Sequence, residues 1–447
     1  MKKILTLVLV LALTVCPIAY AQGEETQLLV AAAVRDVTPT IENGLLPIPG
    51  IGRDAGPIVD VIDPLRTRVI ALQSGDSTAL IVCTETGKGP TGWQFAKALS
   101  EHTGVPVEAI FYTTTHSHSA PELKTEITLE PVEGEEVDNK TLWGRYVLEQ
   151  MCSAADEALA NLKPATAGIG YSESYINTNR NRTYISRADG TTYRELGYNP
   201  TGISDKTLVV VRFDDLDGNP IAYIVNYPVH AVTMIANTYF DGQTGVSSDI
   251  PGHVSTLLEE QNPGSVAVWT SGAAGDQNPI ASNQVMYPDP ETGDLVTEYT
   301  GEVKIMEYLA NIHYADILTA IESIAPVAAD DVAFAEGITS IPNEEGSEEA
   351  EFALHLKVLR IGDIAFVGSP AELYTSIGMY MKENSIIENT IVVNHTWTQE
   401  EAYNGYVLDD DARVNGGYGG GRLVYKTGYV NDALADLMNS LLEETLS

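Results

Sequence analysis

Two histidines, His116 and His118, lie two positions apart in the segment THSHSAP, directly after a run of apolar residues. Side chains alternate in extended chain, so the two imidazoles would point to the same side. Such a pair could chelate a metal ion, or could supply one ligand and a neighbouring acid or base. An isolated His-x-His motif is weak evidence, but the apolar run and the flanking Ser, Thr and Pro are typical of a site at the end of a strand.

Three other segments carry reactive side chains just after predicted strands, where α/β folds build their sites. His230 (in NYPVHAV) ends a predicted hairpin, Glu372 follows IAFV and is predicted to open a helix, and Asp276 lies in WTSGAAGDQNP. The small residues before Asp276 would let backbone approach a ligand, and Asp276 could orient a ligand histidine. Each segment also has a structural alternative: a core histidine, a helix-stabilising glutamate, and a strand-to-helix turn capped by Asp276.

Two histidines and one carboxylate from separate strand ends match the ligand set of a catalytic zinc, which keeps a position for water. Zinc lowers the pKa of its bound water toward 7 and polarises a carbonyl, so no serine nucleophile is needed. The chain has no Gly-x-Ser-x-Gly, no His-Glu-x-x-His and no phosphate-binding Gly-x-x-x-x-Gly-Lys-[Ser/Thr] motif.

The 447-residue chain carries a formal charge of −37, from 62 acidic and 25 basic residues. This charge excludes nucleic acid and anionic membrane surfaces as partners, because both would repel it. The hydrophobic content of 44% and the 22 tyrosines also exclude a disordered acidic tail. We therefore expect a globular protein that acts on a small-molecule or N-acyl amide substrate; its oligomeric state stays open.

The first residues have the pattern of a secretory signal, with two lysines, an apolar stretch over 4–15 and a small-x-small site that ends at Ala21. The apolar stretch is too short to span a bilayer. A lipidated Cys16 is the weaker alternative, because valine precedes it. We expect residues 1–21 to be removed and residues 22–447 to form the exported domain, secreted or periplasmic, without a transmembrane segment.

Only two cysteines follow the predicted signal, Cys83 and Cys152. Two thiols cannot build a thiolate-rich zinc or iron–sulfur site, and they allow at most one disulfide. Both lie in apolar or helical surroundings, which favours free thiols.

Strand-like and helix-like segments alternate along the chain, with no repeat and no low-complexity linker. The expected strands are 66–72, 79–83, 109–115, 265–270 and a pair over 351–368, with a hairpin over 208–227 that turns at Asp217-Gly218. The expected helices are 92–103, 141–162, 249–262, 302–325, one from about 372, and 431–445. This order predicts a mixed α/β (α+β) fold: one domain that is a layered sandwich of mixed β-sheets covered by helices.

Eight short motifs, in order, resemble the catalytic domain of the neutral/alkaline non-lysosomal ceramidases. They are RDVTP, PLRTRVIAL, THSHSAP, NYPVHAV, SSDIPGH, SGAAGDQNP, PAEL and NGYVLDDDARVNGGY. The resemblance runs from about residue 30 to 425, nearly the whole chain after the predicted signal.

The resemblance implies one zinc ion per chain and assigns roles to residues in the matching motifs. The implied zinc ligands are His116, His230, Glu372 and Tyr406. The implied catalytic residues are His118, Tyr418 and the arginine of an Asn-Arg motif, which either Arg180 or Arg182 satisfies. Asp249, Asp276 and Asn278 would lie around the ligands or line the substrate.

The chain departs from the family pattern in two respects. Asn278 stands where ceramidases have the serine of Gly-Asp-x-Ser-Pro, so an acyl-serine route is closed and zinc-activated water is the expected nucleophile. Ceramidases also continue into a C-terminal β-sandwich domain, whereas one more helix (431–445) is the last element expected in this sequence.

The function expected from these features is an exported, zinc-dependent hydrolase of the ceramidase type that cleaves a linear amide (N-acyl) bond, as in lipid metabolism. Two alternatives stay open. One is a zinc esterase or lactonase acting on a small soluble substrate. The other is a non-catalytic binding protein with this fold.

Overall fold

A computed structural model of the chain describes residues 27–49, 57–87, 92–123, 129, 137–185, 190–235, 244–281, 284–288, 295–299, 303–398 and 405–447. The predicted signal segment 1–21 lies outside these residues. Among the described residues, no helix combines the length and the apolar character needed to cross a membrane.

The largest sheet has nine strands in the order β14-β12-β11-β8-β1-β5-β6-β7, with β18 paired to β8. Its strands are β1 (Leu29–Asp36), β5 (Arg66–Ser74), β6 (Ser77–Thr84), β7 (Ile110–Thr114), β8 (Lys163–Glu173), β11 (Thr207–Asp215), β12 (Pro220–Tyr227), β14 (Val266–Ser271) and β18 (Ala325–Val327). Only two residue pairs join β1 to β8. The sheet folds over at this weak seam, so β14 contacts both β5 and β6 although it lies far from them in the strand order.

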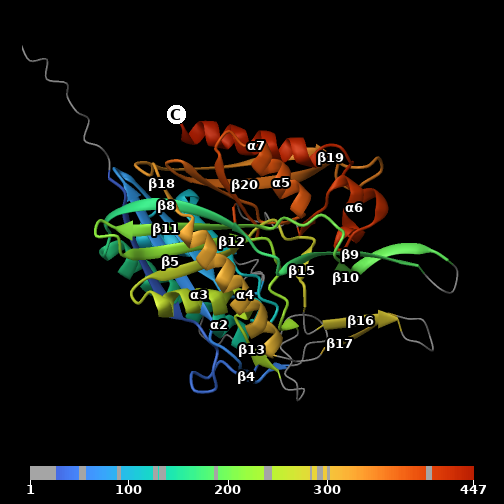
Figure 1. The fold of residues 1–447 in the computed structure, drawn as a ribbon, viewed down its shortest axis with the longest axis horizontal. Coiled ribbons are helices and arrows are strands. Elements are labelled where there is room, and N and C mark those ends of the chain that lie inside the picture. The colour runs from blue at the N-terminus through green and yellow to red at the C-terminus, as the bar shows by residue number, and fades with distance from the viewer. Residues whose placement is uncertain are drawn as a thin grey trace, which may run out of the picture.

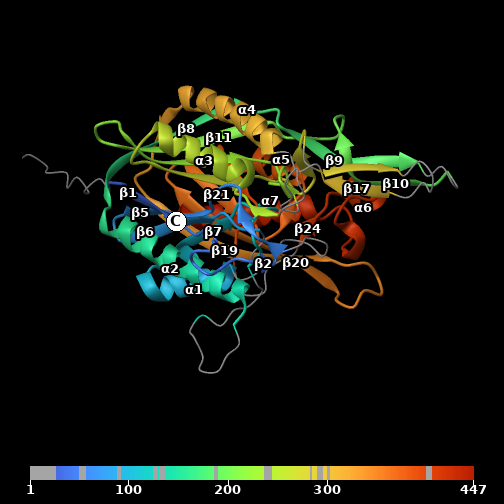
Figure 2. The same cartoon turned by 90° about the horizontal axis from the view of Figure 1, so that it is seen from below.

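The folded sheet forms the two inner layers of a sandwich, and helices cover both outer faces (Figure 2). Helices α1 (Gly92–Thr103) and α2 (Asn139–Ala160) cover the half with β1 and β5, while α3 (Asp249–Gln261) and α4 (Val303–Glu322) cover the half with β8, β11 and β14. Residues of β11 alternate accordingly: Val209 and Val211 face the core between the halves, whereas Leu208 and Val210 face α3 and α4.

A second sheet has the order β19-β20-β21-β23 and lies between the sandwich and two helices (Figure 1). Its strands are β19 (Val332–Pro342), β20 (Glu351–Ile361), β21 (Ile364–Gly368) and β23 (Asn389–Val393), and the helices are α5 (Thr375–Glu383) and α7 (Val430–Thr445). Phe366 packs edge-to-face on Phe111 of β7, with ring centroids 6.1 Å apart. The opposite face, with Val358 and Ala365, packs in the core that includes α5 and α7.

Short pairings complete the fold. A projecting hairpin of β9 (Asn177–Ile185) and β10 (Thr192–Asn199) carries β15 (Gln277–Pro279) as a third strand (Figure 1). The two-stranded pairs are β2 (Ile48–Pro49) with β3 (Pro57–Ile58), β4 (Asp60–Val61) with β13 (Gly245–Val246), β16 (Gln284–Pro288) with β17 (Leu295–Tyr299), and β22 (Glu372–Leu373) with β24 (Tyr406–Val407). The remaining helical turns are η1 (Val107–Ala109), α6 (Asp410–Asn415) and η3 (Gly420–Arg422).

The predicted mixed sandwich of sheets and helices is confirmed. The predicted hairpin is β11–β12, and its turn places Gly218 at φ +84°, a conformation that glycine adopts without strain. Cys83 and Cys152 are free thiols.

One local prediction is wrong, and one structural alternative is excluded. Glu372 does not open a helix: its N–H donates to Gly405 O within the β22–β24 pairing, and α5 starts three residues later at Thr375. No helix follows β14 either, because the chain continues into β15, which pairs with β9. In both places a pairing with a distant segment overrides the local preference.

Candidate metal and catalytic site

Three parallel strand pairs direct their carboxyl ends toward one site. These pairs are β6–β7, β12–β14 and β21–β23. The chain leaves β7 into His116, leaves β12 into His230 and leaves β21 into Glu372. The predicted strand-end residues are thus brought together by the sheet topology, as expected for carboxyl-end sites.

The ring nitrogens of three histidines meet at this point. His116 Nε2 lies 3.1 Å from His118 Nε2, and ligand atoms of His116, His118 and His230 all lie within 4.8 Å of one another. Glu372 joins them, with Oε2 2.9 Å from His230 Nε2 and Oε1 3.8 Å from His116 Nε2. His116, His230 and Glu372 are buried, whereas His118 is partly accessible to solvent.

Tyr406 reaches the same cluster through a short pairing of two strands. Strands β22 and β24 pair in parallel with Glu372 opposite Tyr406. The Tyr406 hydroxyl accepts a hydrogen bond of 2.9 Å from Arg180 NH2, which also lies 3.3 Å from His230 Nε2. The four residues implied as zinc ligands are therefore neighbours in space.

The donor set fits a zinc ion in type and in spacing. Imidazole nitrogens, a carboxylate and a phenol oxygen are ligands that zinc accepts. Tetrahedral bonds of about 2.1 Å place neighbouring ligand atoms roughly 3.4 Å apart. The separations of 2.9 Å and 3.8 Å from Glu372 to the two histidines lie on either side of that value.

Burial and mutual contact set the protonation states of these groups. Burial lowers the pKa values of His116 and His230, and nearby Arg180 lowers that of His230 further. Burial alone would raise the pKa of Glu372, but the neighbouring histidines outweigh it and hold that pKa well below its usual value. The site thus favours neutral imidazoles and an ionised carboxylate, the forms that bind metal.

The backbone around the site is strained. Among the described residues, the non-glycine residues with positive φ are His116 (56°), Asp249 (56°) and His395 (57°). Such conformations cost on the order of 1–3 kcal/mol each and persist where surrounding contacts enforce them, often at functional sites.

His230 is oriented by a backbone carbonyl rather than by Asp276. Gln277 O accepts from the His230 backbone N–H at 3.1 Å and lies 3.1 Å from His230 Nδ1. Asp276 instead accepts from Thr375 N (2.9 Å) and Asn179 Nδ2 (2.7 Å), so its carboxylate holds the start of α5 against β9. The expectation that Asp276 orients a ligand histidine is wrong for this reason.

Arg180, and not Arg182, faces the site. Arg180 is buried, and its guanidinium contacts the Gly275 carbonyl, Asn278, His230 and Tyr406. Arg182 is exposed: its NH1 donates to Tyr198 O at 3.4 Å, and its guanidinium lies over the Tyr184 ring. Of the two arginines, Arg180 is therefore the one that contacts residues of the cluster.

Tyr418 forms the rim of the site. Its ring packs edge-on against Tyr406, with centroids 5.6 Å apart, and the Arg180 guanidinium lies 4.8 Å from its ring centroid. Its backbone is held by Asn181 Oδ1, which accepts from Tyr418 N, and by the Tyr374 hydroxyl, which donates to Tyr418 O. With 36% of its surface exposed, Tyr418 is open to a ligand that approaches from solvent.

His395 is a residue of the site that the sequence analysis missed. Its buried ring stacks on His116 with centroids 4.1 Å apart and 20° between the planes. It follows β23, which is parallel to β21. The same rule that selected the other strand-end residues applies to the segment IVVNHTW, so it could have been found.

Asp249 supports the site from behind. Its carboxylate accepts from Met234 N at 2.9 Å and from Ile250 N at 2.7 Å, and the preceding Ser247 accepts at its carbonyl from Ser117 Oγ. Asp249 therefore ties the start of α3 to the loop after His230, and Ser247 ties the same segment to the loop that carries His118. In the contacts of the described residues, Asp249 does not touch the histidine cluster itself.

The buried Asp249 carboxyl leads to a stability prediction. Burial raises its pKa to about 6, from 3.8 for an ordinary aspartate. Between about pH 4 and 6 the unfolded chain loses this proton while the folded protein keeps it, so the free energy of unfolding falls as pH rises. Relative to Asp249→Asn, the wild type should lose about 3 kcal/mol over this range in urea unfolding. The exposed-turn variant Asp217→Asn is the control, and a constant difference between wild type and Asp249→Asn would contradict the prediction.

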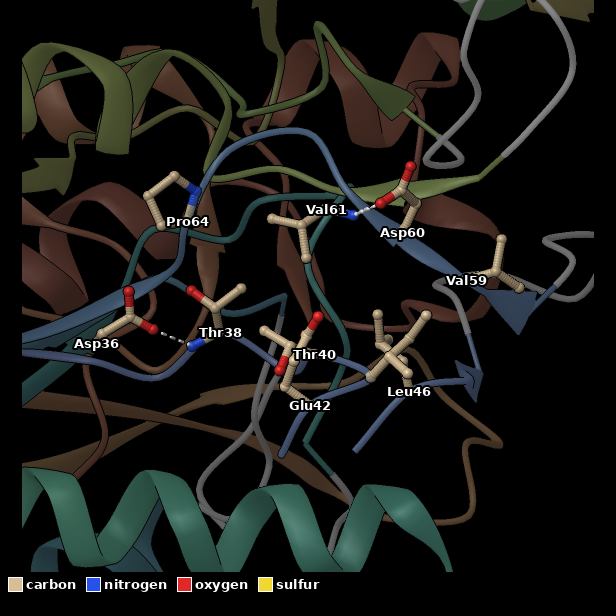
Figure 3. A pocket seen from close by; sticks show the side chains of 10 residues that line it. Asp36, Thr38, Thr40, Glu42, Leu46, Val59, Asp60, Val61 and Pro64 are labelled. Carbon is tan, nitrogen blue, oxygen red and sulfur yellow. Dashed lines mark hydrogen bonds between the residues drawn. The ribbon is translucent and has the colours of Figure 1, made fainter. Parts of the chain in front are cut away.

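A cavity of about 410 Å³ lies elsewhere, lined by residues of segments 36–46 and 59–64 (Figure 3). Two carboxylates at this cavity hydrogen-bond to nearby backbone: Asp36 accepts from Thr38 N, and Asp60 accepts from Val61 N (Figure 3). No residue of the histidine cluster is among its described lining residues.

No family model matches the chain. Among solved structures, neutral ceramidase from Pseudomonas aeruginosa aligns over 93% of this chain and 74% of its own, with 15% identity and a TM-score of 0.67. A ceramidase complexed with C2 aligns over 94% of this chain and 76% of its own, with 16% identity and a TM-score of 0.68. The chain therefore has the fold of the neutral ceramidases.

Proposed function

We propose that the protein is a zinc-dependent hydrolase that cleaves an acyl amide. The observation that carries this proposal is the convergence of His116, His230, Glu372 and Tyr406 beside Arg180. The Glu372 carboxylate oxygens lie 2.9 Å from His230 Nε2 and 3.8 Å from His116 Nε2. The neutral ceramidase fold supports the choice of an amide as the bond that is cleaved.

The metal, when bound, supplies an activated water and polarises the scissile carbonyl. His116, His230 and Glu372 would hold it with buried neutral imidazoles and an ionised carboxylate. Burial raises the pKa of Tyr406 well above its usual value, although Arg180 acts in the opposite direction. Tyr406 therefore keeps its phenolic proton in the metal-free protein. A metal ion bound nearby would favour the ionised phenolate.

The other residues move protons and stabilise charge. His118 Nε2 faces the ligand cluster, and the partial exposure of this side chain allows it to exchange protons with solvent, as a general acid and base must. Arg180 and the Tyr418 hydroxyl are the donors for the oxyanion that forms at the carbonyl carbon. The leaving amine would take its proton from His118.

We also propose that the protein is exported after cleavage near Ala21, as its first residues indicate.

An ester presents the same kind of carbonyl group to the site as an amide. Amides and esters of the same acyl group should therefore be compared in one assay. Metal analysis of the purified protein, followed by this assay, tests the function. Absence of stoichiometric zinc, or full turnover after chelation, would refute it. Tight binding without turnover would identify a binding protein.

Tyr418→Phe tests the role of the phenol. The variant keeps the ring that packs on Tyr406 and Arg180 but loses the hydroxyl, so kcat should fall about 10²-fold while zinc content stays at the wild-type level. The measurement is steady-state turnover with metal analysis on the same samples. The exposed Tyr429→Phe is a matched control. An unchanged kcat in Tyr418→Phe would remove the phenol from the mechanism.

A further inference from the structure

The guanidinium group of Arg180 lies between Asn278 and the ligand cluster. Strand β15 pairs with β9 so that Asn278 is opposite Thr178, and Gln277 is opposite Asn179. In this register Arg180 NH1 donates to Asn278 Oδ1 at 3.1 Å, while NH2 of the same guanidinium reaches Tyr406 and His230.

The contact with Arg180 fixes which way the amide of Asn278 is turned. A guanidinium has only donors, so the amide atom that faces it must be the oxygen. The Nδ2 group, with its two N–H donors, is then not used by Arg180. Within the described part of the chain, Nδ2 makes no hydrogen bond to an acceptor, and Asn278 is partly exposed, so these donors are available to a ligand.

Arg180 is nearly fully occupied by the protein. Its Nε and one NH2 hydrogen are directed at Gly275 O, at 3.1 Å and 2.7 Å, and its second NH2 hydrogen is directed at the Tyr406 hydroxyl. One NH1 hydrogen is used by Asn278. Of five donors, the described contacts leave one NH1 hydrogen, next to the free amide of Asn278.

The free NH1 hydrogen of Arg180 and the Nδ2 hydrogens of Asn278 indicate which kind of ligand the site suits. A carboxylate or phosphate ligand is best held by two parallel N–H groups of one guanidinium, which Arg180 cannot offer here. One N–H from Arg180 and one from an amide side chain instead suit a single oxygen atom that gains charge during the reaction, as in oxyanion holes built from backbone or asparagine donors.

We propose that Asn278 is a catalytic residue, whose Nδ2–H, together with Arg180 NH1–H, donates to the carbonyl oxygen of a neutral acyl group as that oxygen becomes an oxyanion. This inference rests on the proposed hydrolase function. Asn278 forms no bond to the substrate: water adds to the carbonyl carbon, the amine leaves with a proton, and Asn278 stabilises the charge between these steps. Asn278, which stands where the family motif has a serine, would thus contribute to catalysis as a hydrogen-bond donor.

Three variants separate donation from positioning of Arg180. Asn278→Ala removes both functions. Asn278→Asp keeps an oxygen for Arg180 but has no donor at neutral pH. Asn278→Ser offers a shorter hydroxyl donor. Asn219→Ala, an exposed asparagine in the β11–β12 turn, is the control. Zinc content and thermal unfolding of every variant establish that fold and metal are intact.

The probes are a hexanoyl p-nitroanilide and its phosphonamidate analogue, which mimics the tetrahedral transition state. We expect kcat to fall 10²-fold or more in Asn278→Ala and Asn278→Asp with KM changed less than threefold, and Asn278→Ser to lie between them and wild type. Affinity for the phosphonamidate should fall in parallel, while affinity for acetohydroxamate, a metal ligand that needs no oxyanion donor, should not change.

Two results would overturn the inference. Wild-type activity in Asn278→Asp would show that the residue only positions Arg180, and equal phosphonamidate affinity in wild type and Asn278→Ala would show that Nδ2 makes no such bond. In both cases the hydrolase function stands, because the wild type still turns over the anilide. If metal-loaded wild type turns over no amide or ester of the acyl series, the proposed function fails and the inference fails with it.

Discussion

His116→Ala is expected to abolish turnover and to leave the purified protein with far less than one zinc per chain. The alanine removes one of the buried imidazoles of the cluster, and its neighbours His118 and Glu372 lose the nitrogen that they face at 3.1 Å and 3.8 Å. Loss of the metal removes several kcal/mol of transition-state stabilisation, which corresponds to a rate reduction of about 10³-fold or more.

The measurement pairs metal analysis with turnover after zinc is added back. His102→Ala is a matched control, because His102 is an exposed histidine on α1 that contacts Asp156. It should retain one zinc and full activity. The proposal that His116 is a ligand is wrong if His116→Ala binds zinc as tightly as wild type, whatever its activity.

The effect of His116→Ala on folding can be measured separately from the loss of the metal. His116 is held at a positive φ, where alanine is as strained as histidine, so the backbone term changes little. Removal of the ring opens space beside the stacked His395, which costs roughly 1–3 kcal/mol. Urea unfolding of the metal-free proteins separates this cost from the loss of the metal.

Arg180→Lys is expected to lower kcat by about 10²- to 10³-fold while zinc stays bound. Lysine keeps the positive charge, but one ammonium cannot contact Gly275 O, Asn278 and Tyr406 with the fixed geometry of the guanidinium. The oxyanion then loses a preorganised donor, and Tyr406 loses the donor at its hydroxyl.

Arg182→Lys serves as the control two residues along the same strand. Its contacts are the Tyr198 carbonyl and the Tyr184 ring, so its kcat should change less than about twofold. Equal losses in the two variants would point to the hairpin as a whole rather than to the Arg180 guanidinium. Retention of full activity in Arg180→Lys would exclude a directional role for the arginine.

The elements that the sequence predicts well are those with strong local signals. Helix α1 begins and ends where its apolar spacing and Gly104 indicate, and the β11–β12 hairpin turns at Asp217-Gly218, because glycine at positive φ is a local requirement. Apolar runs also located β5, β6, β7 and β14 within one or two residues. The predicted signal segment lies outside the described residues and stays a prediction.

Glu372 shows where local signals fail. A glutamate before a helical pattern favours a helix N-terminus, but its backbone pairs with the β24 segment more than thirty residues later. This pairing also brings Tyr406 to the cluster. Nothing local to Tyr406 marks it among 22 tyrosines, so only the family resemblance selected it.

The arginine pair shows the same limit. Arg180 and Arg182 point to one side of β9 by alternation, so strand periodicity cannot separate them. The difference is that β15 pairs with β9 only over Asn177–Asn179, beside Arg180, and the hairpin then projects from the body of the protein with Arg182 exposed (Figure 1).

By itself, the sequence determined the chemical types of the site residues, their places at strand ends and the layered class of the fold, because these depend on short-range periodicity and on side-chain chemistry. The tertiary structure decided which groups share one site: Arg180 over Arg182, Gln277 O over Asp276 as the partner of His230, and Asn278 against the guanidinium. These choices depend on strand pairing between segments that are distant along the chain, and contacts of that kind are set by the packing of the whole fold.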